Sequence, residues 1–217
     1  MLRAIIFDFN GVIVETSDMN AQIFAQLFRP FGPEVVEKVT AHYKAYGGIP
    51  RQKRIELYLK EFAHTRPTKE VIDHISQRFS QIYLQKLQDA KIVEGVRQFL
   101  NDYYQDYAFF LSSGAPQEDL PEMLRILRIS HYFIEAFGAP RDKSQHISFI
   151  LQKYEFEPQQ VVFVGDSPKD KEAAEKNKIW FIARDRGLES LKNEPFKIKN
   201  FYDLPAVLEE INQKSSN

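Results

Sequence analysis

Polar residues suited to a phosphate and metal site follow several short apolar runs of this chain. They are Asp8, Asn10, Ser112, Ser113, Gly114, Lys143, Asp166 and Asp170. Carboxylate oxygens without histidine or cysteine beside them suit Mg²⁺, a hard cation. A lysine near the carboxylates neutralises charge on a phosphoryl group, and a serine hydroxyl with backbone N–H groups binds phosphate oxygens. A carboxylate can also attack phosphorus and form an aspartyl-phosphate.

The apolar runs themselves predict a parallel sheet, because short apolar runs that end at polar or glycine residues are typical of buried parallel strands. The expected strands are Ala4–Phe9, Tyr107–Leu111, Ile134–Phe137, Val161–Val164 and Ile179–Ala183. Helical stretches separate the later strands, so we expect an α/β fold with a Rossmann-like, doubly wound parallel sheet. In such sheets ligands bind at the carboxyl ends of the strands, which is where the polar residues lie.

Helical periodicity accounts for most of the remaining chain. The helices expected in its second half are Gln117–Leu127, Ser144–Tyr154, Asp170–Asn177 and Asp203–Asn212, with a frayed end at 213–217. Those expected between the first two strands are Met19–Phe28, Glu34–Tyr46, Arg51–Phe62 and Lys69–Leu87. A segment of about 70 residues is too long for a structureless loop, so it predicts an inserted all-helical subdomain.

Composition restricts the class of protein further. The chain has 217 residues, 43% hydrophobic and 27% charged, which is typical of a globular protein with a packed core. It has no cysteine, which excludes disulfides, thiolate metal sites and cysteine nucleophiles. A net charge of −1 gives no global attraction to nucleic acid or to an anionic membrane. Signal-peptide and membrane-span patterns are absent, so we expect a cytoplasmic protein, either a monomer or a homodimer.

Four segments, FDFNGV, LSSG, GAPRDK and VGDSPKD, resemble the four signature motifs of the haloacid dehalogenase-like superfamily, in the usual order. The helical stretch between the first two resembles the helical cap of that superfamily. The resemblance implies an α/β core at 1–15 and 90–217 and a cap at 16–89. The cap stretch YGGIPRQKRIELY is also similar to a group of bacterial members described only as hydrolase-like.

The resemblance implies a magnesium site and a nucleophile. By position, Asp8 is expected to be the nucleophile and also a metal ligand. The other expected ligands are the backbone carbonyl of Asn10 and the carboxylates of Asp166 and Asp170, the last binding directly or through water. Lys143 is expected to pair with both the phosphate and Asp8.

The phosphate and the rest of the substrate are expected to meet a second set of residues. The resemblance assigns Ser112 to the phosphoryl oxygens, together with the backbone of Ser113 and Gly114. In the cap, Arg51 is a candidate for gripping a substrate anion bidentately when the cap closes over the site. The expected substrate is a small phosphorylated metabolite.

Asn10 departs from the motif, because phosphatases of the superfamily carry a second aspartate there as general acid and base. An amide cannot exchange a proton near neutral pH, and general acid–base catalysis is typically worth about 10²–10⁴-fold. The protein then either hydrolyses esters whose leaving groups need no proton, or binds a phosphorylated ligand without turnover. Alternatively, Glu15 at the entry to the cap supplies the proton, or deamidation of Asn10 before Gly11 regenerates an acid.

Dehalogenases of the superfamily also lack the second aspartate, but they do not need the metal-binding pair. The presence of both Asp166 and Asp170 therefore favours a phosphoryl substrate. A phosphomutase would normally need the missing aspartate too. The sequence thus predicts a magnesium-dependent phosphohydrolase-like protein that acts through Asp8, with a catalytically weak or inactive binding protein on the same fold as the alternative.

Overall fold

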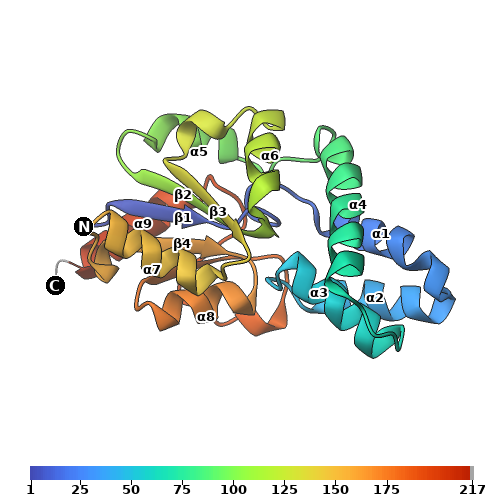
Figure 1. Ribbon diagram of the computed structural model, residues 1–217. Helices are drawn as coiled ribbons and strands as arrows, with labels where there is room; N and C mark the ends of the chain where they lie inside the picture. The colour runs from blue at the N-terminus through green and yellow to red at the C-terminus, as the bar shows by residue number, and fades with distance from the viewer. Residues whose placement is uncertain (216–217) are drawn as a thin grey trace.

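The computed structural model describes residues 1–215 and contains one six-stranded parallel sheet with the order β3-β2-β1-β4-β5-β6 (Figure 1). Its strands are β1 (Ala4–Phe7), β2 (Ala108–Pro116), β3 (Glu135–Ala139), β4 (Val161–Gly165), β5 (Trp180–Arg184) and β6 (Lys197–Ile198). The chain starts in the middle of the sheet and winds outward in both directions. The expected doubly wound α/β fold is therefore confirmed, with β6 as an additional short edge strand.

Helices cover both faces of the sheet (Figure 1). On one face lie α5 (Val96–Tyr103), α6 (Leu120–Ile126) and α9 (Leu204–Ser215), and on the other lie α7 (Lys143–Lys153) and α8 (Pro168–Lys176). Successive side chains of a strand point to opposite faces. Accordingly, Ile5 and Phe7 of β1 belong to the first core and Ala4 and Ile6 to the second. All four are completely buried, which fixes β1 between two packed layers.

The segment between β1 and β2 is helical throughout its ordered elements, as expected. It contains α1 (Ser17–Phe28), α2 (Pro33–Ala45), α3 (Arg51–Leu57), a π-helical turn (Tyr58–Phe62) and α4 (Lys69–Leu87). We call α1 to α4 the cap helices; they lie together beyond the carboxyl ends of the strands (Figure 1). An aromatic cluster holds them, with the Phe24 ring 4.6 Å from Phe79 and 5.5 Å from Tyr58. The division into a cap at 16–89 and a core stays a prediction.

Two differences from the expected elements have local causes. Helix α5 lacked a sequence signal, because it begins after Gly95, whose φ of 81° and missing side chain provide no N-cap hydrogen bond. Helix α9 continues through Ser215 and so includes the first three residues expected to fray, whereas 216–217 lie outside the described residues. Within residues 1–215, no helix combines the length and apolar character needed to cross a membrane.

A buried histidine ties α7 to the sheet just below the strand ends. His146 is 1% exposed, its Nδ1 lies 2.8 Å from Ser112 Oγ, and its Nε2 lies 3.1 Å from the Gly138 carbonyl oxygen. Since a carbonyl only accepts, Nε2 carries the proton and Nδ1 accepts from the serine hydroxyl. Burial lowers the pKa of His146 to about 4, so the ring is neutral at physiological pH.

This contact predicts acid sensitivity. The folded pKa of about 4 lies below the ordinary histidine pKa of 6.5, so between these values only the unfolded chain takes up the proton. Stability from His146 is therefore complete above about pH 6.5 and lost as the pH falls toward 4. Between pH 7 and pH 5 we expect the free energy of unfolding to fall by about 2 kcal/mol through this group.

Urea unfolding at both pH values measures the effect. The loss of unfolding free energy between pH 7 and pH 5 should be about 2 kcal/mol larger in wild type than in His146→Asn, because Asp8 and the other groups contribute equally to both. His131→Asn, at an exposed histidine of the same chain, should behave as wild type. An equal pH dependence in wild type and His146→Asn would show that the buried imidazole is not its source.

Candidate active site

Asp8 lies directly beyond β1, the strand at the centre of the sheet. Its backbone N–H donates to the Val164 carbonyl at 2.9 Å, which joins it to the end of β4. The residue is only 5% exposed. Burial raises the pKa of its carboxyl group to about 8, opposed by Lys143 and reinforced by Asp170 and Asp166. A carboxylate in this position needs nearby positive charge to stay ionised.

Lys143 provides part of that charge from the first turn of α7. Its ammonium group lies 2.9 Å from Asp8 Oδ1 and also contacts Asp170 Oδ1. Burial alone would lower the pKa of Lys143, but the attraction of Asp170 and Asp8 outweighs burial and raises it. The lysine is therefore a fixed cation at the carboxyl ends of the strands. Asp142 caps α7 in a capping box with Gln145, which fixes the helix start that carries this lysine.

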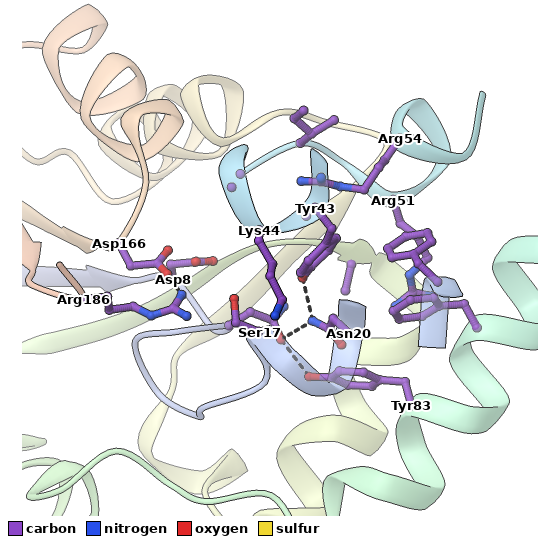
Figure 2. A pocket seen from close by; sticks show the side chains of 18 of the residues that line it. Asp8, Ser17, Asn20, Tyr43, Lys44, Arg51, Arg54, Tyr83, Asp166 and Arg186 are labelled. Atoms are coloured by element: carbon purple, nitrogen blue, oxygen red, sulfur yellow. Dashed lines mark hydrogen bonds and ion pairs between the residues drawn. The ribbon is translucent and has the colours of Figure 1, made fainter. Parts of the chain in front are cut away.

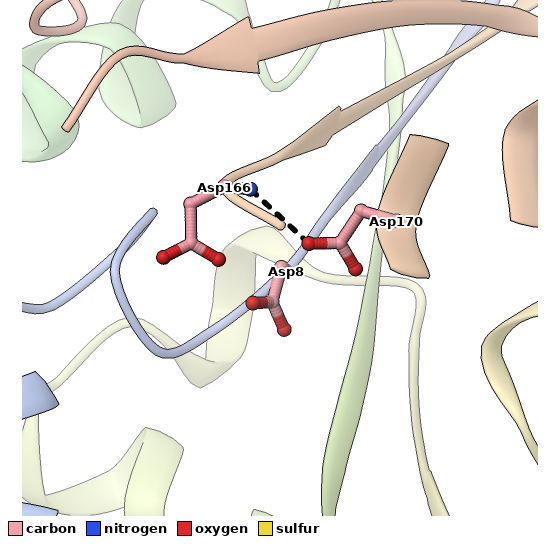
Figure 3. A group of neighbouring side chains, drawn as sticks. All are labelled: Asp8, Asp166 and Asp170. Atoms are coloured by element: carbon pink, nitrogen blue, oxygen red, sulfur yellow. Dashed lines mark hydrogen bonds between the residues drawn. The ribbon is translucent and has the colours of Figure 1, made fainter. Parts of the chain in front are cut away.

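Three carboxylates converge on this point, Asp8 from the end of β1 and Asp166 and Asp170 from the junction of β4 and α8 (Figure 3). One oxygen from each of Asp8, Asp166 and Asp170 lies within 4.8 Å of the others. Burial and the charge of Asp170 raise the pKa of Asp166, while Arg186 from the loop after β5 forms an ion pair with it and lowers it. The cluster carries more negative charge than Lys143 alone can balance.

The two aspartates after β4 have different surroundings. Asp170 Oδ2 accepts from Asp166 N–H, Ser167 N–H and Ser167 Oγ at 2.8–3.1 Å, and its Oδ1 accepts from Lys143. Its acceptor capacity is thus committed to the turn and to the lysine. By contrast, Asp8 Oδ2 and Asp166 Oδ1 take part in no hydrogen bond or ion pair within residues 1–215. These hard oxygens fit a divalent cation, with Asp8 and Asp166 as direct ligands and Asp170 as the residue that orients the turn.

Two glycines permit close approach around the carboxylates. Gly11 has φ +83°, and a Cβ atom there would lie 2.1 Å from Asp166 Oδ2. Gly48, in the loop between α2 and α3, has φ +72°, and its Cβ would lie 2.7 Å from Ser167 Oγ. Both positions combine a left-handed backbone with contact to the turn after β4, so a side chain at either would push that turn away. The second contact also shows that the cap loop rests on the core beside the site.

Asn10 is held by its amide oxygen rather than left free. Asn10 Oδ1 accepts from Thr16 Oγ1 at 2.5 Å and from Tyr83 Oη at 2.9 Å, with Asn20 Nδ2 at 3.5 Å. Burial, and then Tyr43, raise the pKa of Tyr83, which therefore stays a donor. The side chain that replaces the expected second aspartate is thus an anchor between the strand end and the cap helices α1 and α4.

The residues of the predicted phosphate-binding turn, Ser112, Ser113 and Gly114, lie in different surroundings. Gly114 lines the cavity in front of Asp8, whereas Ser112 is fully buried and its hydroxyl meets His146. Ser113 Oγ accepts the N–H of Ala115 at 3.1 Å. Gly114 thus borders the cavity and Ser112 meets His146, and the roles of Ser112, Ser113 and Gly114 in phosphate binding stay predictions.

Arg51 and Glu15 both have partners of opposite charge. Arg51 Nη1 lies 2.8 Å from Asp119 Oδ2 and 2.6 Å from Ser80 Oγ, which joins α3 to the segment after β2. Glu15 forms an ion pair with Arg184 and is not among the residues lining the cavity. Glu15 thus faces a guanidinium group, not the space in front of Asp8.

A cavity of about 140 Å³ joins the carboxylate cluster to the cap helices. Asp8 and Asp166 line its core side (Figure 2). Lys143 also lines the cavity. Its cap side is lined by Asn20, Phe24, Tyr43, Lys44, Arg51, Arg54, Phe79 and Tyr83.

Sequence reasoning missed most of these cap residues, as well as Arg186 and His146. The cap residues come from four helices whose facing sides are set only by tertiary packing. The single available signal was the run of positive residues Arg51, Lys53 and Arg54 at a predicted helix start.

Comparison with known proteins places this geometry in a family. Residues 5–184 match the model of the family described as haloacid dehalogenase-like hydrolase. A phosphorylated carbohydrates phosphatase of Thermotoga maritima is 20% identical over 178 residues, 80% of each chain.

Solved structures share the fold. β-Phosphoglucomutase from Clostridium difficile superposes with a TM-score of 0.82 at 19% identity, covering 100% of both chains. CbbY from Rhodobacter sphaeroides, solved in complex with phosphate, gives a TM-score of 0.76 at 16% identity, covering 96% of this chain and 100% of that one. The hydrolase class expected from the four motifs is confirmed by the family match. With its doubly wound sheet and its match over most of its length, the chain belongs to the haloacid dehalogenase-like hydrolase family.

Proposed function

We propose that the protein is a magnesium-dependent phosphohydrolase that acts on a small phosphorylated metabolite through an aspartyl-phosphate at Asp8. The observation that carries the proposal is the convergence of Asp8, Asp166 and Asp170 around Lys143 at the carboxyl ends of the strands. Such a cluster of buried carboxylates is costly unless a cation balances its negative charge. The names of the Thermotoga maritima phosphatase and of β-phosphoglucomutase support a small phosphorylated metabolite as the substrate.

Asp8 is the group that attacks phosphorus. The attack forms the new Asp8–phosphorus bond and breaks the bond to the leaving oxygen, and water then releases phosphate from Asp8. Lys143, 2.9 Å from Asp8 Oδ1, orients the carboxylate and lies where it can contact the transferred oxygens. When bound, a magnesium ion supplies positive charge that keeps Asp8 ionised and offsets the charge of the phosphoryl oxygens.

Asn10 determines which substrates suit this site. Its amide neither protonates the leaving oxygen nor activates water. The neighbouring Tyr83 hydroxyl is engaged in a hydrogen bond that it donates to the amide oxygen. Glu15, with its carboxylate held by Arg184, is poorly placed to substitute. The site therefore favours esters whose leaving group departs without a proton, such as acyl or aryl phosphates. The cytoplasmic location and the oligomeric state stay predictions.

Phosphate release from p-nitrophenyl phosphate and acetyl phosphate tests the activity. We expect release that requires Mg²⁺, that stops on chelation, and that falls by about 10³-fold or more in Asp8→Asn. The matched control is Asp106→Asn, which changes an exposed carboxylate before β2 and should behave as wild type. Equal rates for wild type and Asp8→Asn on both substrates would leave the non-catalytic binding protein as the remaining function.

The effect of position 10 can be measured directly. Asn10→Asp places a carboxyl group among the hydroxyl donors of Thr16 and Tyr83 and restores an acid. We expect single-turnover release of glycerol from glycerol 3-phosphate to rise by about 10²-fold, because the alkoxide then receives a proton. Cleavage of acetyl phosphate should change far less, because acetate leaves without one.

Two controls accompany this comparison. Asn101→Asp makes the same change on the exposed side of α5 and should have no effect. Peptide mass analysis of the wild type, fresh and aged, shows whether Asn10 stays an amide or deamidates. No gain for Asn10→Asp on the alkyl ester would mean that the missing acid is not what limits the first step.

A further inference from the structure

The cavity in front of Asp8 is lined by five cationic and two carboxylate side chains. Its charged lining comprises Asp8, Asp166, Lys44, Arg51, Arg54, Lys143 and Arg186. Four of the five cations have carboxylate partners. Lys143 pairs with Asp8 and Asp170, Arg186 with Asp166, Arg51 with Asp119, and Lys44 with Asp18. Within residues 1–215, Arg54 is the lining cation that has no carboxylate within 4.0 Å.

Arg54 is also one of the most deeply buried charges of the cap, with 3% of its surface exposed. Its guanidinium group has only neutral neighbours. Nη2 donates to the Tyr46 carbonyl at 2.6 Å, Nη1 donates to the Tyr58 hydroxyl at 3.2 Å, and Cζ lies 4.6 Å from the centre of the Tyr43 ring. These contacts use two of its five N–H donors. A buried guanidinium without a counter-charge is costly, whereas one that meets an anionic ligand is not.

The position of Arg54 specifies which part of a ligand it would meet. Figure 2 shows its guanidinium group beside Tyr43 on the cap side, with Asp8 and Asp166 across the cavity. The phosphoryl group that Asp8 attacks has its own cation, Lys143, on the core side. The charge of Arg54 is therefore left for the leaving-group part of the substrate.

We propose that Arg54 binds a second anionic group of the substrate, so that the protein acts on small phosphate esters whose alcohol part carries a carboxylate or another phosphate. This inference rests on the proposed function for the place of the first phosphate. The planar guanidinium group can hold either anion through two parallel hydrogen bonds. Arg51 on the same helix does not compete for this role, because Asp119 already neutralises it.

The test measures binding, so that it does not depend on turnover. Two proteins are titrated calorimetrically with Mg²⁺ present. One is the Asp8→Asn variant, which keeps Arg54, and the other carries both Asp8→Asn and Arg54→Gln. The ligands are 3-phosphoglycerate and glycerol 3-phosphate, which share a three-carbon skeleton and differ by a carboxylate against a neutral hydroxymethyl group. A second pair, glucose 1,6-bisphosphate and glucose 6-phosphate, tests phosphate as the second anion.

With Arg54 in place, we expect at least one of the two ligands with a second anionic group to bind about 10- to 100-fold more tightly than the matched ligand that lacks this group. Arg54→Gln should reduce this ratio to about twofold or less, and Arg54→Lys should retain part of it. Lys60→Gln, at an exposed lysine paired with Glu56, should keep the ratio of the parent protein. A ratio near one for both ligand pairs with Arg54 in place overturns the proposal.

An unchanged ratio in Arg54→Gln also overturns it, because Arg54 would then act only on the shared phosphate or on the structure of the cap. If Arg54→Gln does not fold, as judged by circular dichroism, the ratios with Arg54 in place and with Lys in its position still decide the question. Failure of the proposed function has a different signature. It would be seen as absent phosphate release by the protein with native Asp8, whatever the binding ratios are.

Discussion

The balance of charge around Lys143 is the constraint on which the rest of the structure depends. Two buried carboxylates, Asp8 and Asp170, contact one ammonium group, and Asp166 lies beside them. Asp170 serves the fold and the site at once, since it completes the capping box that starts α8 with Ser167 and also anchors Lys143. The strand ends, the start of the helix and the charge cluster are therefore one unit, and a change in any of them alters the other two.

The hydrogen bonds of Asn10 explain why an amide at this position does not disrupt the fold. Its amide oxygen accepts from Thr16 and Tyr83, and a carboxylate oxygen could accept the same two bonds. The packing between the end of β1 and the cap helices is thus compatible with either residue. The difference lies in charge and in proton transfer, which separates the chemistry of position 10 from its structural role. In this chain the structural role is retained and the acid–base role is absent.

The sequence was sufficient for the core of the site and insufficient for its cap side. Asp8, Lys143 and Asp166 follow strands or begin helices, and parallel strands bring such positions together whatever the rest of the chain does. The wall formed by Tyr43 and Arg54 has no comparable rule. Which side of each cap helix faces Asp8 depends on how four helices pack on one another, and a charge run at a helix start has the same pattern whether it is buried or solvated. Burial of Arg54 became visible only in three dimensions.

The placement of positive charge on the core side and on the cap side of the cavity matters because position 10 carries no acid. Without a proton donor at position 10, negative charge that develops on the leaving oxygen must be stabilised by fixed positive charge. The cap side of the cavity supplies Arg54, the lining cation without a carboxylate partner in the described residues, while Lys143 stays with Asp8, the proposed nucleophile. A second anion on the substrate would neutralise Arg54 and at the same time fix the orientation of the alcohol part. The same residue would then both select the substrate and hold its leaving group in place, which is the main contribution that a site without general acid catalysis can still make.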